Sequence, residues 1–83
     1  MKYFVRTNLP QAAEGPFDLE RARLQLRKSL HEEHGRGHAL HEGHRGIWLI
    51  SAGDDDTRLV WIADEHDGVV RLNDGSGQGS FLH

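Results

Sequence analysis

The chain has 83 residues, no cysteine and a net charge of −3. This length supports one domain with a modest core, the missing thiols exclude a disulfide framework, and the acidic balance argues against direct binding of nucleic acid. No apolar run approaches the roughly 20 residues of a membrane span, and no signal-peptide pattern opens the chain. We therefore expect a single cytoplasmic domain with no membrane partner.

The first part of the chain predicts a strand followed by a helix. Aromatic and β-branched residues over 2–7 favour a strand, and residues 11–15 indicate a short loop. Asp18 is a suitable N-cap, so the helix should begin at Leu19 and end near residues 33–34, where two glycines follow. Apolar residues at helical spacing give this helix one apolar face.

Two apolar runs in the second half, residues 47–50 and 59–63, predict buried strands. Unbroken apolar runs require cover on both faces of a sheet, because successive side chains of a strand point to opposite sides. Residues 69–72 predict a last strand, and the short turns between these segments favour antiparallel neighbours. We expect an α+β domain over residues 1–75, with the order β-α-β-β-β and one helix on a mostly antiparallel four-stranded sheet, followed by a flexible tail at 76–83.

One helix can cover only one face of that sheet. The other face must meet a bend of the sheet, a second copy of the chain or a different protein, and this is the strongest functional indication in the sequence. Trp48 and Trp61 lie in the two apolar runs, and aromatic side chains dominate the energetics of interfaces. We expect a tryptophan at the contact; the alternative is that both tryptophans belong to the core. The strand register decides which face each one occupies.

Acidic residues gather in the two turns that flank the second apolar run. Aspartate and glycine are common in turns, so these residues could serve only to form and solubilise the loops. The alternative is an acidic surface that attracts a basic protein partner. The candidate partner-binding residues are Trp48, Trp61, Asp54, Asp55, Asp56, Asp64, Glu65 and Asp67.

Five histidines lie between residues 31 and 44, among glycines and glutamates. Imidazole binds zinc, nickel and copper, and spacings of three or four residues on a helix bring two histidines to one ion. The plain alternative is a solvated Gly/His-rich loop over 35–45, because the segment lacks the ligand spacing of recognised zinc motifs. Joint protonation on mild acidification is a third interpretation. The candidate ligands for zinc or nickel are His31, His34, His38, His41 and His44.

No catalytic signature is present. The sequence lacks a nucleophile elbow, a phosphate-binding glycine loop, a cysteine nucleophile and a His-Glu-x-x-His motif. A small metal-dependent nuclease or phosphodiesterase is a further alternative, in which a histidine of the cluster acts as general base and Arg36 or Arg45 holds phosphate. We expect a protein that is not an enzyme.

Two resemblances bear on the function. Residues 3–6, a short loop and residues 15–20 (Gly-Pro-Phe-Asp-Leu-Glu) resemble the opening of GYF-type peptide-binding domains, but the rest departs from that pattern and no family is assigned. In size, acidity and lack of cysteine the chain resembles small accessory and antagonist proteins of mobile elements, including anti-CRISPR proteins. We expect a small interaction or inhibitory domain that binds protein through an apolar sheet face and acidic loops, as a monomer or a homodimer.

Overall fold

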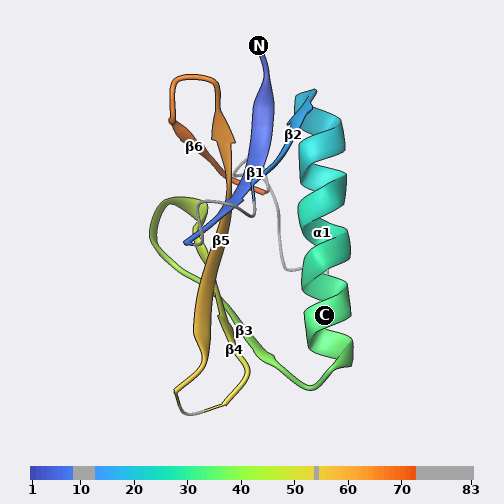
Figure 1. Cartoon of the computed structure of the whole chain (residues 1–83), viewed down its shortest axis with the longest axis vertical. Helices are drawn as coiled ribbons and strands as arrows, with labels where there is room; N and C mark the ends of the chain where they lie inside the picture. Colours follow the sequence, from blue (N-terminus) through green and yellow to red (C-terminus); the bar gives the residue numbers. More distant parts are fainter. Residues whose placement is uncertain (9–12, 54, 73–83) are drawn as a thin grey trace.

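The computed structural model describes residues 1–8, 13–53 and 55–72. Within these ranges the chain forms six strands, one α-helix and a short 3-10 turn (Figure 1). The elements in chain order are β1 (Tyr3–Thr7), β2 (Glu14–Phe17), α1 (Leu19–Gly35), β3 (Ala39–Glu42), η2 (His44–Gly46), β4 (Trp48–Ser51), β5 (Thr57–Asp64) and β6 (Val69–Val70). This arrangement confirms the α+β class and the helix packed on a mostly antiparallel sheet.

Helix α1 begins at the predicted residue and ends close to the predicted one. The Asp18 side chain accepts a hydrogen bond from the Arg21 backbone N–H at 2.7 Å, which satisfies an unpaired donor of the first turn. At the other end, the Arg36 backbone N–H donates to carbonyls of the last turn. The buried residues of the helix are Ala22, Leu26, Leu30 and Glu33.

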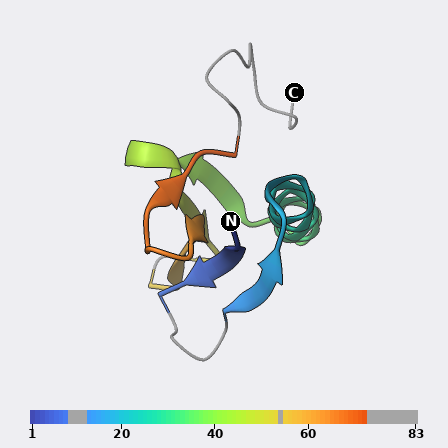
Figure 2. The same ribbon diagram turned by 90° about the horizontal axis from the view of Figure 1, so that it is seen from above.

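The sheet has the strand order β2-β1-β5-β4-β3, with β6 paired to the second half of β5. Every strand pair among the described residues is antiparallel. Helix α1 contacts both edge strands, β2 and β3, as well as β1 and β5, and the sheet curls around the helix (Figure 2). The sheet therefore has a concave side, which α1 closes, and a convex side, which no described helix covers.

Strand register assigns side chains to these two sides. Trp48 pairs with Val60, and both are buried in the core beneath α1. Leu49 and Leu59 are one position away on each strand, so they pair on the convex side, and Trp61 lies on that side two positions further along β5. The two tryptophans therefore face opposite sides of the sheet. The core comprises Val5, Ala22, Leu26, Leu30, Trp48, Ile50, Val60, Ile62 and Leu72.

The sequence-based prediction missed the two edge strands, β2 and β3, because it placed residues 11–15 and 35–45 in loops. Strand β2 contains a Gly-Pro pair, which disfavours a strand interior but is tolerated at an edge. Its approach to β1 requires glycine, because a Cβ on Gly15 (φ 137°) would lie 2.8 Å from the Phe4 ring. Strand β3 is exposed apart from half-buried Leu40, so its sequence carries little apolar alternation. The described sheet thus has six strands where four were expected.

The other strands agree with the prediction to within a few residues. The largest difference is β6, which has two residues, while Leu72 follows it and is fully buried in the core. The predicted tail at 76–83 lies outside the described residues. Among the residues that the structure describes, no helix has the length and apolarity needed to cross a membrane.

Candidate functional site

The convex side of the sheet carries partly exposed apolar side chains. Leu49, Leu59 and Trp61 are half-buried, and cross-strand pairing places Leu49 beside Leu59. Arg6 lies opposite Trp61 on β1, and its guanidinium carbon lies 5.4 Å from the centre of the Phe4 ring. We name the four apolar residues the convex apolar strip: Phe4, Leu49, Leu59 and Trp61. Here large apolar side chains remain accessible to solvent on a side that no described helix covers.

Acidic residues flank the convex apolar strip at both ends of β5. Asp55 and Asp56 are exposed in the turn before the strand, and Glu65 and Asp67 are exposed in the turn after it. The eight residues of β5 separate the two turns by about 25 Å at 3.3 Å per residue. Asp54 lies outside the described residues. Those predicted acidic residues that the structure describes therefore lie at two ends of one apolar surface.

The turn after β5 uses one of its carboxylates internally. The Asp64 carboxylate accepts hydrogen bonds from the backbone N–H groups of Gly68 at 2.9 Å and His66 at 2.8 Å. These two bonds lower the pKa of Asp64. Asp67, by contrast, has a side chain that is 81% exposed and lies 3.4 Å from the Arg6 guanidinium. Asp64 thus shapes the turn, whereas Asp67 presents its charge at the surface.

The burial of the two tryptophans settles their roles in the fold. Trp48 is only 4% exposed and packs in the core. Trp48, one of the two predicted contact tryptophans, therefore lies beneath α1 and not on the convex side. Trp61 is half-buried on the convex side, which leaves it as the candidate contact tryptophan.

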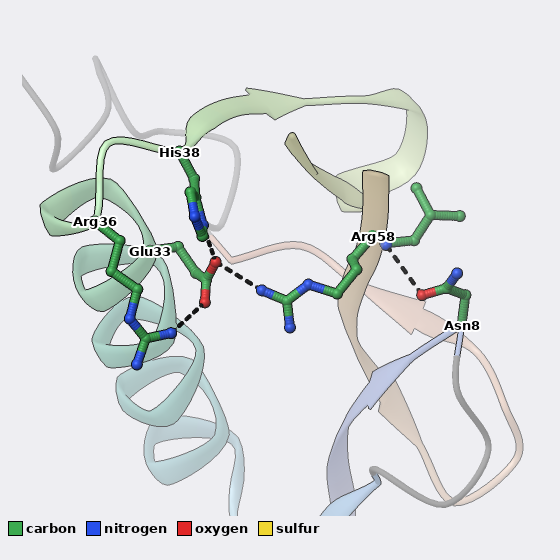
Figure 3. A network of polar contacts seen from close by, with 6 residues as sticks. Asn8, Glu33, Arg36, His38 and Arg58 are labelled. Carbon is green, nitrogen blue, oxygen red and sulfur yellow. Dashed lines mark hydrogen bonds and ion pairs between the residues drawn. The ribbon is translucent and has the colours of Figure 1, made fainter. Parts of the chain in front are cut away.

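A polar cluster fastens the end of α1 to the sheet (Figure 3). The Glu33 side chain is only 9% exposed, and its carboxylate lies 3.0 Å from Arg36 Nη1, 2.5 Å from His38 Nδ1 and 2.6 Å from Arg58 Nη2. Burial by itself would raise the pKa of Glu33, but hydrogen bonds from His38 and Arg58 and their charges outweigh burial, so the pKa is lowered. We name these four residues the Glu33 cluster.

A cavity of about 230 Å³ lies beside the Glu33 cluster, between α1, β1 and β5. Its polar lining includes Thr7, Glu14, Glu33 and Arg58, but not His38. The three histidines proposed as a general base, His38, His41 and His44, are thus not among its lining residues. Arg36 and His38 follow α1 directly and Arg58 lies on β5, so the contact between Glu33 and Arg58 joins the end of the helix to the sheet.

The histidine-rich segment is distributed over several elements. His31 and His34 lie on the last turns of α1, while His44 is in η2. His38 contacts the buried glutamate on the concave side, whereas His41 lies across from a leucine of the convex side. Within the described ranges, no group of three or more His, Asp or Glu side chains is arranged to hold a metal ion.

The sequence-based prediction missed the Glu33 cluster, although the position of Glu33 on the apolar face of the helix could have indicated it. Glu33 follows Leu26 and Leu30 at helical spacing, which places it on the buried face of α1. A carboxylate on that face needs a cationic partner. The partner on β5, Arg58, is 25 positions away along the chain, and no local pattern connects the two residues.

Comparisons of the chain with protein-family models, with curated proteins and with solved structures found no match. No family is therefore assigned to the chain.

Proposed function

We propose that this chain is a small protein-binding domain and that a basic protein docks on the convex apolar strip. The observation that carries the proposal is the strip itself, in which strand register joins Leu49, Leu59 and Trp61 on a side that no helix of the described residues covers. Contiguous apolar surface is typical of protein interfaces, and an aromatic residue near its centre is the usual energetic anchor. Trp61 is that anchor.

The charges at the two ends favour a different protein over a second copy of the chain. If two strips stacked face to face with their β5 strands aligned, parallel or antiparallel, the acidic turns of one chain would meet acidic turns of the other. Like charges across an interface oppose association. A basic partner instead meets favourable charge at Asp55 and Asp56 and again at Asp67, with apolar contact between them. Opposite charge also speeds the encounter of the two proteins.

The function of such a domain is interaction or inhibition. A protein that binds nucleic acid through a basic groove offers the charge that the acidic turns require. Occupying that groove would exclude the nucleic acid, as expected for an antagonist protein of a mobile element. Nucleic acid added to the complex should then displace the chain.

Site-specific photo-crosslinking tests the proposal in the cells that produce the protein. A photoreactive side chain replaces Leu59 in the strip, and a matched control carries it at Leu24, which is 55% exposed on α1. We expect an adduct with a basic protein from position 59 and none from position 24. An adduct of twice the 9.4 kDa chain mass, or the same adduct from both positions, would overturn the proposal.

Titration of the captured partner measures the contribution of the anchor. Trp61→Glu should weaken binding at least tenfold, about 1.4 kcal/mol, because it places a charge where an aromatic side chain is desolvated. Leu24→Glu adds the same charge on the far side of the helix and should leave the affinity unchanged. Circular dichroism establishes that both variants fold, and Leu59→Ser replaces Trp61→Glu if the latter unfolds. An affinity insensitive to both strip variants would exclude this surface.

A further inference from the structure

A groove of about 630 Å³ lies where three distant segments meet, away from the Glu33 cluster. Arg23 on α1, Arg45 in η2 and Arg71 after β6 all line it. Val69 and Val70 of β6 form an apolar part of its wall. Three arginines thus line one groove in a chain whose net charge is −3.

These arginines are not neutralised by carboxylates among the described residues. The ion pairs of the described chain involve Arg6, Arg36, His38 and Arg58, and none involves an arginine of the groove. The Nε of Arg23 donates to the Arg71 backbone carbonyl at 3.3 Å, which leaves the terminal nitrogens available. The carboxylate at the groove, Asp67, pairs with Arg6. An anion bound in the groove would therefore meet positive charge that no described carboxylate offsets.

The backbone fixes the position of two of the three arginines. Arg45 has φ 62°, a left-handed conformation that arginine rarely adopts, and Gly46 follows with φ 92°. A Cβ on Gly46 would lie 3.0 Å from the Arg71 Cα, so the turn packs directly against residue 71. Such backbone strain is often retained where a side chain must be held for a ligand. The spacing of Arg45 and Arg71 is therefore set before any ligand arrives.

We propose that this groove binds a small phosphorylated ligand, of the size of a nucleoside diphosphate. One guanidinium group can donate two parallel hydrogen bonds to the oxygens of a phosphate. Three arginines from separate elements could therefore bind a ligand with more than one phosphate group. The half-buried valines offer a surface for an apolar or aromatic group attached to the phosphates. The volume also falls within the range of about 300–1,000 Å³ that is usual for ligand sites.

Calorimetry on the full chain tests the groove with ADP, inorganic pyrophosphate and adenosine as probes. We expect ADP and pyrophosphate to bind and adenosine, which has no phosphate, to give no heat. Tighter binding of ADP than of pyrophosphate assigns a nucleotide as the ligand, whereas equal binding assigns phosphate alone; either result supports the site. Absence of binding by both phosphates at low salt would overturn the proposal.

Arginine variants locate the binding. Arg45→Gln and Arg71→Gln should each weaken ADP or pyrophosphate binding at least tenfold, because each removes one guanidinium from the groove. Arg21→Gln is the matched control, since Arg21 is exposed on α1 but does not line the groove. Thermal unfolding of each variant checks that the fold persists, and Arg45→Lys provides a milder change at the strained position. Binding that is equally strong in all variants would show that the phosphates bind elsewhere and would overturn the proposal.

Discussion

The buried carboxylate of Glu33 couples the stability of this domain to pH. Burial favours the neutral acid, but the hydrogen bonds and charges of His38 and Arg58 outweigh it, so the pKa of Glu33 lies below its ordinary value of 4.5. A group whose pKa is lowered by folding adds stability above its ordinary pKa and loses that stability as the pH falls through the folded value. The free energy of unfolding should therefore decrease as the pH falls below about 4.5.

Replacement of this carboxylate by an amide tests its role. Glu33→Gln should lower the free energy of unfolding at neutral pH by about 2 kcal/mol, because it leaves Arg58 and His38 without their shared negative charge. It should also reduce the loss of stability in acid, leaving the part that comes from Asp64. Glu32→Gln is the control, since this neighbour is exposed. Urea unfolding at neutral and acidic pH measures both variants, and equal effects would contradict a special role for Glu33.

Among the elements, those with local signals were predictable and those that depend on distant partners were not. The N-cap at Asp18 and the leucine spacing predict α1 almost to its ends. The apolar runs likewise predict β4 and β5, since β-branched and aromatic residues favour strands on their own. Strand β3 instead forms because it pairs with β4. Its mostly exposed residues give no apolar pattern from which this pairing could be predicted.

The candidate sites likewise contain residues that the sequence alone could predict and residues that only the folded chain brings together. The acidic turns were identified from composition, because charges at the ends of a strand need no register to be placed. The choice between Trp48 and Trp61 required the pairing of β4 with β5, since a shift by one residue exchanges the two faces. The arginine groove joins α1, η2 and the end of β6, and only the folded chain brings these segments together.

The edge strand β2 depends on one glycine. Gly15→Ala should lower the free energy of unfolding by about 2 kcal/mol, because alanine disfavours the positive φ and its Cβ would meet the Phe4 ring. Gly35→Ala, at the end of α1, is the control and should instead raise the free energy of unfolding, because nothing lies within 4 Å of the added Cβ and alanine favours helix. Denaturant unfolding compares them. A Gly15→Ala protein as stable as the wild type would contradict the close packing of β2 on β1.

At the level of the whole molecule, the curl of the sheet explains how one helix suffices for a core. Because α1 contacts both edge strands, it closes the concave side, and the apolar residues of that side are buried together. The convex side keeps the alternate set of apolar residues, which the helix cannot reach. The apolar strands predict cover for both faces, and among the described residues the fold supplies it for one.

Light scattering of the purified chain on a sizing column tests most directly whether this face serves a different protein. Since stacked strips would bring acidic turns together, we predict a mass of one chain, 9.4 kDa, up to the highest attainable concentration. A dimer that persists in Leu24→Glu but dissociates in Trp61→Glu would contradict the account, because it would show that a second copy of the chain covers the convex apolar strip.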